Sequence, residues 1–138
     1  MTEADALSQR HATAFADTMR PWSPAEFTDL LDAPHTHLID TGHAFALTRI
    51  VADEAELLTL ATDPAHRRKG MARALLRALE NHAREAGATT LFLEVSANNT
   101  PAIALYDAAG YQTTSRRPKY YQSPTGMRVD ALILTKAL

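Results

Sequence analysis

The segment that most constrains how this chain can fold runs from residue 55 to residue 87. Its first part, AELLTLATD (55–63), is mostly apolar and ends at an Asp-Pro pair, which predicts a buried strand. Its last part (71–86) repeats apolar side chains at helical spacing, and Gly87 suits the position just after a helix. The predicted apolar face consists of Ala72, Leu75, Leu76, Leu79, Ala83 and Ala86. A buried strand followed by an amphipathic helix predicts an α/β fold with parallel pairing around that helix.

The loop between this strand and this helix concentrates positive charge. Arg67, Arg68 and Lys69 run directly into Gly70, although the whole chain has a net charge of −2. A helix N-terminus exposes unpaired backbone N–H groups and a partial positive charge, which together favour anions. Gly70 has no side chain to keep a phosphate away from the backbone. The pattern therefore indicates a phosphate-binding turn, while a solvated basic turn is an equally good interpretation of the run alone.

Strand and helix patterns continue on both sides of this segment. Helices are expected over 3–18 and over 24–32 with Ser23 as N-cap. Another is expected from Thr100 as N-cap, with Pro101 as its first residue, to Gly110. Strands are expected over 36–40, 44–51, 89–95, 111–117 and 128–135, with a turn at 123–126 before the last one. This order predicts a single domain over residues 1–138, in which helices flank a mixed central β-sheet.

Composition excludes several classes of function. The chain has no cysteine, so disulfides, thiolate catalysis and cysteine-based zinc sites are excluded. The net charge of −2 argues against a general binder of nucleic acid or anionic membranes. His35 and His37 lack a convergent third ligand, so no metal site is expected. The polar N-terminus is unlike a signal peptide and no apolar run approaches a membrane span, so a cytoplasmic protein is expected.

Residues 91–111, LFLEVSANNTPAIALYDAAGY, hold the candidate proton-transfer groups. Glu94 lies inside a predicted strand, and a carboxylate there is costly unless it is paired, hydrated or functional. Burial also raises the pKa of a carboxyl group toward the range useful for a general base. An ion pair with an arginine is an equally good interpretation of Glu94. Taken alone, Tyr106 is better interpreted as a core tyrosine, and Asn98 and Asn99 as turn residues.

Together these motifs resemble the GNAT superfamily of N-acetyltransferases. Arg67-x-x-Gly70-x-Ala72, at a helix start between two strands, is similar to the family's acetyl-CoA pyrophosphate motif, and residues 93–111 are similar to the distal half of its fold. RRPKYY (116–121) resembles a hairpin of protein N-terminal acetyltransferases, which implies that Tyr120 and Tyr121 wall a slot that admits a free chain end. RPWSPAEF (20–27) resembles a segment of the bacterial ribosomal-protein-alanine N-acetyltransferases. The fold usually opens with a short strand before its first helix. Here that strand is expected to be missing or vestigial.

The resemblance implies acetyl-CoA as co-substrate and no metal. Leu60, Ala61 and Thr62 would offer backbone groups to the pantetheine arm, and one N–H would polarise the thioester carbonyl. Asn99 would also bind the pantetheine arm. Glu94 would be the general base, acting through water, and Tyr106 the acid that protonates the departing thiolate. The pyrophosphate would be held by Arg67, Arg68, Lys69, Gly70, Met71 and Ala72.

The resemblance further implies acetylation of the N-terminal alanine of a small-subunit ribosomal protein by a monomer or weak dimer. Two alternatives stay open. The same fold could acetylate a lysine or a small-molecule amine, or it could be a non-catalytic acyl-CoA-binding module. The presence of both Glu94 and Tyr106 at the matching positions argues against the second alternative.

Overall fold

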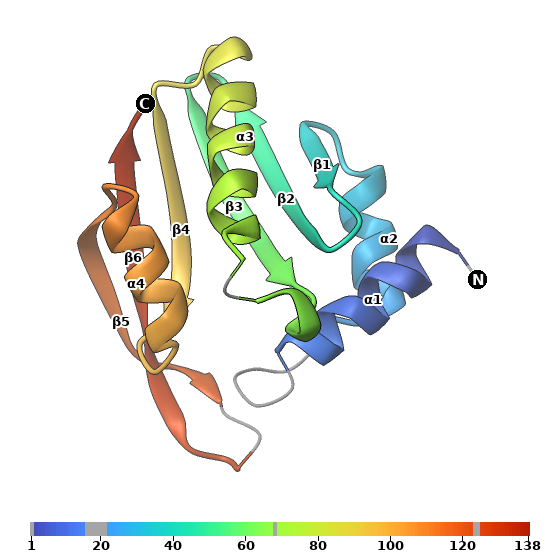
Figure 1. Cartoon of the computed structure of the whole chain (residues 1–138). Coiled ribbons are helices and arrows are strands. Elements are labelled where there is room, and N and C mark those ends of the chain that lie inside the picture. Colours follow the sequence, from blue (N-terminus) through green and yellow to red (C-terminus); the bar gives the residue numbers. More distant parts are fainter. Residues whose placement is uncertain (1, 16–21, 68, 123–124) are drawn as a thin grey trace.

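The computed structural model describes residues 2–15, 22–67, 69–122 and 125–138, which form a six-stranded sheet flanked by helices (Figure 1). The helices are α1 (Glu3–Ala14), α2 (Pro24–Asp32), α3 (Met71–Glu85) and α4 (Thr100–Ala108), and η1 (Pro64–His66) is a short 3₁₀ turn. The strands are β1 (Thr36–Asp40), β2 (Ala44–Val51), β3 (Glu54–Thr62), β4 (Thr90–Ser96), β5 (Gln112–Gln122) and β6 (Arg128–Ala137). The mixed α/β architecture predicted from the sequence is confirmed.

The sheet has the strand order β1-β2-β3-β4-β6-β5. All neighbouring strands are antiparallel except β3 and β4, which are parallel and are connected through α3. A parallel pair requires such a crossover connection, usually a helix, so α3 is placed over the face of the sheet. Within the described residues the chain enters α1 directly at Glu3 with no strand before it, as expected.

The parallel pairing of β3 with β4 is short. It runs from Glu54 opposite Thr90 to Leu57 opposite Leu93 and then stops. The two strands diverge from there toward the lower end of Figure 1. Leu58 is the extra residue of a β-bulge, because Thr59 pairs with Leu47 while Leu57 pairs with Thr48. A bulge bends its strand and increases the local twist, which turns β3 away from β4.

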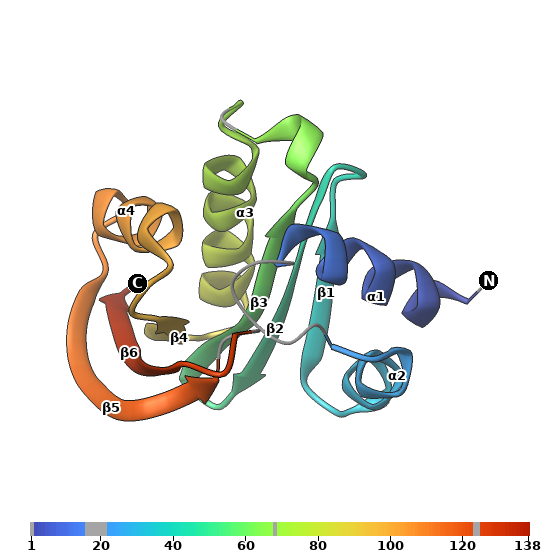
Figure 2. The same ribbon diagram turned by 90° about the horizontal axis from the view of Figure 1, so that it is seen from below.

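Two apolar clusters hold helices on the two faces of the sheet. One cluster packs α3 and α4 on one face with side chains such as Leu76, Leu79 and Leu93. The other packs α1 and α2 with side chains such as Leu7, Phe27 and Phe45. Figure 2 shows α3 and α4 on one side of the sheet and α2 on the other. β2 is buried on both faces because its side chains belong alternately to the two clusters.

Local signals explain where the helices begin. Ser23 and Glu26 form a reciprocal capping box at α2, since each side chain accepts a hydrogen bond from the other's backbone N–H. At α4 the N-cap is Asn99, whose side-chain oxygen accepts from the Ala102 N–H at 3.3 Å. The expectation of Thr100 as N-cap is therefore wrong by one residue, because the asparagine carbonyl can cap the helix one position earlier.

Three other boundaries differ from the sequence pattern. α1 ends at Ala14 rather than at 18, and residues 16–18 lie outside the described part of the chain. Ala86 is exposed rather than part of the buried face, because it follows the last turn of α3. β5 extends to Gln122 past Pro118, since proline is tolerated in an edge strand where a bulge interrupts the pairing. Of the turn expected at 123–126, the first two residues lie outside the described part.

A buried carboxylate on α3 was not predicted. Glu80 is 4% exposed and accepts a hydrogen bond from the Tyr111 hydroxyl at 2.8 Å, while the Lys136 ammonium lies 3.1 Å from both of its oxygens. Burial, and then the Glu80 carboxylate, raise the pKa of Tyr111. These contacts make the charge tolerable inside the fold and tie α3 to the start of β5 and the end of β6.

None of the helices in the described ranges is long and apolar enough to cross a membrane.

We expect Phe45→Ala to lower the free energy of unfolding by about 3–5 kcal/mol, because it leaves a cavity in the cluster that holds α1 and α2. The Phe45 ring is fully buried, lies against Phe27 and supports the Arg10 guanidinium at 4.9 Å. Urea denaturation measures the change. Val51→Ala, at the exposed end of the same strand, should change stability by no more than about 0.5 kcal/mol. Equal losses in the two variants would contradict this packing.

Candidate functional site

Two cavities open where β3 and β4 diverge. The first, called the loop cavity, has a volume of about 570 Å³ and lies between the end of β3, the start of α3 and α4. The second, called the hairpin cavity, has a volume of about 550 Å³ and lies between β3, β4, α2 and β5. Both are lined by Phe15, Leu60, Asn99, Ala102 and Tyr106. The cavities therefore adjoin each other across the gap between the two strands.

Most residues expected to bind a cofactor line the loop cavity. These are Leu60, Ala61, Thr62, Arg67, Gly70, Met71, Ala72 and Asn99. Lys69 is exposed and is not among the lining residues, so the structure does not bring it to this cavity. Arg68 lies outside the described residues. Arg73 and His66 also line the cavity, although the sequence analysis did not assign them to it.

The start of α3 has the features of an anion site. Gly70 is its N-cap, with a left-handed φ of 74°, and no side chain caps the helix. A β-carbon added at Gly70 would meet no atom of the described residues within 4 Å, so they leave the space beside this backbone open. The Arg67 guanidinium is nearby and donates to the Ala14 carbonyl at the end of α1. Backbone donors and positive charge thus face the same cavity.

The free edge of β3 also borders the loop cavity. β3 continues to pair with β2 as far as Thr62, but its pairing with β4 ends at Leu57. Among the described strands, none pairs with the β4-facing edge of β3 beyond that point. Backbone polar groups along such an edge need a partner, either water or an extended ligand.

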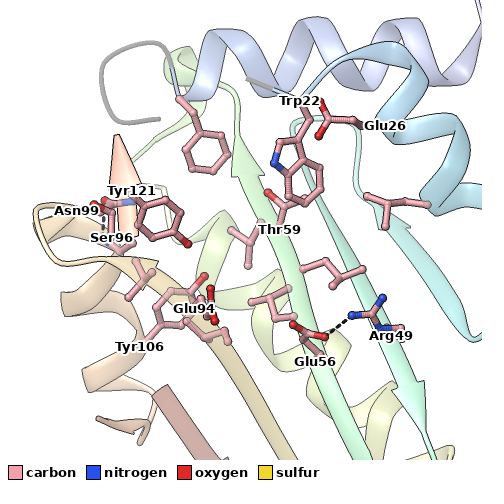
Figure 3. A pocket seen from close by; sticks show the side chains of 18 of the residues that line it. Trp22, Glu26, Arg49, Glu56, Thr59, Glu94, Ser96, Asn99, Tyr106 and Tyr121 are labelled. Carbon is pink, nitrogen blue, oxygen red and sulfur yellow. Dashed lines mark hydrogen bonds and ion pairs between the residues drawn. The ribbon is translucent and has the colours of Figure 1, made fainter. Parts of the chain in front are cut away.

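Glu94 lies on β4, within the hairpin cavity (Figure 3). Its side chain is 24% exposed and lies 3.3 Å from the Arg117 guanidinium of β5. The arginine ion pair that was one interpretation of Glu94 is therefore present. The carboxylate nevertheless remains accessible from the cavity, because it is only partly buried.

Tyr106 lies on α4 and lines both cavities. It is 6% exposed, and its ring packs edge-on against Tyr111 with the centroids 5.6 Å apart. Burial raises the pKa of Tyr106, so its hydroxyl stays protonated at physiological pH. The ring belongs to the core, as expected for a structural tyrosine, and the residue also reaches the junction of the two cavities.

The hairpin cavity is lined by aromatic and acidic side chains, of which only Tyr120 and Tyr121 were expected, as the wall of a slot for a chain end. Tyr120 and Tyr121 of β5 line it, and Figure 3 shows Trp22 and Glu26 across the cavity from Tyr121. Burial, and then Glu94 and Tyr120, raise the pKa of Tyr121 to about 12. Asp29 also lines the cavity, as does the ion pair between Arg49 and Glu56, whose N and O atoms are 2.6 Å apart.

Only part of this lining had a signal in the sequence. Trp22 and Glu26 lie in the segment PWSPAEF, which carried a resemblance, and the two tyrosines lie in RRPKYY. Arg49 and Glu56 carry no motif, and only the register of β2 against β3 places them opposite each other.

The comparisons with known proteins agree with this geometry. The sequence profile of the Acetyltransferase (GNAT) family matches residues 6–111. The chain belongs to the GNAT acetyltransferase family. Its fold, with helices over a mixed sheet and a gap between β3 and β4, is therefore a GNAT fold, as the sequence motifs predicted.

Two relatives within the GNAT family carry the same name. The chain is 45% identical over 91 residues to the ribosomal protein bS18-alanine N-acetyltransferase of Escherichia coli K12. The aligned region covers 66% of this chain and 61% of that protein. The match thus spans less than two thirds of the length of that relative. The enzyme of the same name from Haemophilus ducreyi is 39% identical over 118 residues, covering 83% of this chain and 81% of that protein.

A solved structure supports the same relationship. The crystal structure of the ribosomal-protein-S18-alanine N-acetyltransferase from Escherichia coli superimposes with a TM-score of 0.82 and 34% sequence identity. The superposition covers 99% of this chain and 90% of that one.

Proposed function

We propose that this protein is an acetyl-CoA-dependent N-acetyltransferase that modifies the N-terminal alanine of a small-subunit ribosomal protein. The observation that carries the proposal is the pair of adjoining cavities, one suited to an anionic cofactor and the other to an amine. The relatives named for acetylating ribosomal protein bS18 on alanine support the choice of acceptor.

The loop cavity fits acetyl-CoA. The uncapped start of α3, with Gly70 in a left-handed conformation, offers backbone N–H groups to the pyrophosphate, and Arg67 adds charge. The free edge of β3 at Leu60, Ala61 and Thr62 offers backbone groups to the pantetheine arm, which would lie along it like an added strand. Asn99 would contact the same arm. Met71 and Ala72 complete the turn around the phosphates, and Arg68 is proposed from its position in the motif alone.

Acetyl-CoA supplies an activated acetyl group, which passes to the acceptor nitrogen as the carbon–sulfur bond breaks. A backbone N–H at the end of β3 would polarise the thioester carbonyl. Glu94 would take the proton from the attacking amine through water, since its carboxylate borders the hairpin cavity. Tyr106 would give its proton to the leaving thiolate, and its raised pKa keeps that proton available.

The hairpin cavity fits the end of a peptide chain. Tyr120 and Tyr121 pack with their rings at 81° and would form a wall beside the acceptor. Glu26, Asp29, Glu56 and Glu94 make its lining mainly acidic, with Arg49 as the opposing charge. Such a lining attracts an α-ammonium group. A bulky aromatic wall hinders a lysine on a folded surface, and a confined slot favours a small first residue such as alanine.

Several further expectations belong to this proposal. We propose that residues 1–138 act as one acetyltransferase domain in the cytoplasm, as a monomer or weak dimer, without nucleic-acid or membrane partners. The ribosomal acceptor named for the relatives supports the location. Acetylation of a lysine or a small amine remains the second candidate, favoured by the exposure of Tyr120, which lines the hairpin cavity and is 50% exposed.

We expect Gly70→Val to abolish tight acetyl-CoA binding, because it adds a branched side chain in the open space of the phosphate turn. The substitution also strains a residue with φ of 74°, so the control must carry the same strain. Gly87→Val is that control, because Gly87 lies at the other end of α3 with a φ of 98° and with open space around it among the described residues. Calorimetry with acetyl-CoA should separate the two variants. Unchanged affinity in folded Gly70→Val would reject the site.

We expect Glu94→Gln and Tyr106→Phe to lower kcat by about 10²–10⁴-fold with little effect on acetyl-CoA affinity, because each removes a proton-transfer group while keeping the shape. Steady-state kinetics across pH should show that Glu94→Gln loses the acidic limb of the profile. Arg117→Gln serves as a control, since it removes the ion-pair partner but keeps the carboxylate. Wild-type turnover in both variants would leave Glu94 and Tyr106 with structural roles only.

We expect a peptide with a free N-terminal alanine to be acetylated on its α-nitrogen. An α-amino group has a pKa of ~7.7–8.0 and lysine ~10.4, so freeing the lysine amine near neutral pH costs ~3 kcal/mol more. Mass spectrometry should locate the acetyl group, and kcat/KM should be far lower for the same peptide with a blocked N-terminus and a free lysine. Comparable kcat/KM values for the two peptides would favour the lysine or small-amine alternative.

A further inference from the structure

A cluster of metal-ligand side chains lies at the edge of the loop cavity. Among the described residues, His43, Asp63 and His66 place one potential ligand atom each within 4.8 Å of one another. His43 precedes β2, Asp63 follows β3, and His66 lies in η1. No sequence motif groups these three residues, because only the pairing of β2 with β3 brings His43 to the other two.

Backbone hydrogen bonds fix the positions of the three residues. The Asp63 N–H donates to the His43 carbonyl at 2.8 Å, and the His66 N–H donates to the Asp63 carbonyl at 2.8 Å. Each ligand is thus joined to the next through the main chain. A site built on such a frame loses little conformational freedom when it binds an ion.

The side chains leave coordinating atoms available. The Nδ1 atom of His66 is buried and has no hydrogen-bond partner among the described residues. Buried polar atoms are nearly always satisfied, so such an atom suggests a missing partner. The His43 and His66 rings stack with centroids 3.7 Å apart, and His43 Nδ1 lies 3.9 Å from Asp63 Oδ2. Asp63 Oδ1 faces the Arg10 guanidinium instead, with Nε at 3.6 Å.

We propose that His43, Asp63 and His66 bind a divalent transition-metal ion of borderline softness, with Zn²⁺ as the representative ion. Two imidazoles and one carboxylate form a recognised Zn²⁺ ligand set, and water would fill the fourth position. Asp63 binds the ion through Oδ2, while its Oδ1 remains paired with the Arg10 guanidinium. Contacts of this kind to a metal ligand hold the ligand in its orientation.

The geometry requires a modest adjustment. Tetrahedral bonds of ~2.0–2.1 Å place ligand atoms ~3.3 Å apart, so the three donors, now within 4.8 Å of one another, must draw together by up to about 1.5 Å. The stacked rings must also turn so that their nitrogens converge. The His43 side chain is 51% exposed and is free to make this movement, whereas His66 and Asp63 are held in η1 and at the end of β3.

The test is calorimetric titration of the whole chain, freed of any histidine tag, with Zn²⁺ alone. We expect one equivalent to bind, and His43→Gln and His66→Gln each to weaken binding by at least ~10-fold. His43 is half exposed, so its variant should fold even if the His66 variant does not. The matched control is His37→Gln. His37 also contacts a histidine, His82, with ring centroids 4.8 Å apart, but belongs to no ligand cluster within the described part of the chain.

Thermal unfolding gives a second readout. Zn²⁺ should raise Tm in wild type and in His37→Gln, because an ion that binds only the folded state stabilises it, and should leave Tm of His43→Gln nearly unchanged. Spectra with Co²⁺ in place of Zn²⁺ should show tetrahedral coordination that is lost in the same variant. The proposal is overturned if wild type binds no stoichiometric Zn²⁺, or if His43→Gln and His37→Gln bind it alike.

Discussion

The parallel pairing between β3 and β4 ends after four residue pairs, and the candidate site depends on that early end. Backbone N–H and C=O groups at a strand edge must find partners, so the exposed edge of β3 from Leu58 onward is suited to an extended ligand. The same divergence leaves room on both faces of the sheet, and both cavities open there. Continuous pairing to the end of β3 would have closed the gap with main-chain hydrogen bonds.

Packing on both faces of the sheet keeps this gap open. The bulge at Leu58 turns β3 away from β4, and β2 anchors it through pairing that continues to Thr62. The clusters around Leu79 and around Phe27 fix α3 and α2 on opposite faces. Arg67 links the phosphate turn to the end of α1 through the Ala14 carbonyl. A site framed by packed elements needs little reorganisation when its ligands arrive.

Charge is distributed unequally between the two cavities. The loop cavity has Arg67, Arg73 and the uncapped start of α3, whereas the hairpin cavity has Glu26, Asp29, Glu56 and Glu94 against Arg49. This arrangement suits an anionic cofactor on one side and a cationic amine on the other, although the chain as a whole is nearly neutral. Tyr106, protonated and shared by both cavities, lies where the two ligands would meet.

The sequence by itself determined the elements and the turn at Gly70, because these depend on local patterns. The strand of residues 55–63, the turn at Gly70 and the helix after it are consecutive in the chain, so short-range spacing was enough to predict them. The predicted ends of α1 and β5 were wrong. Residue propensity does not determine how far the packing of a helix or the pairing of a hairpin extends.

Tertiary structure alone decided the rest, because the partners are distant in sequence. Nothing local places Glu56 opposite Arg49, pairs Glu80 with Tyr111 and Lys136, or brings His43 to Asp63 and His66. Glu94 and Tyr106 could be named from their motif, but only the divergence of β3 from β4 places both on one opening. Strand register and sheet order depend on which face of each strand is buried against the rest of the chain. Local sequence patterns carry no information about those distant partners.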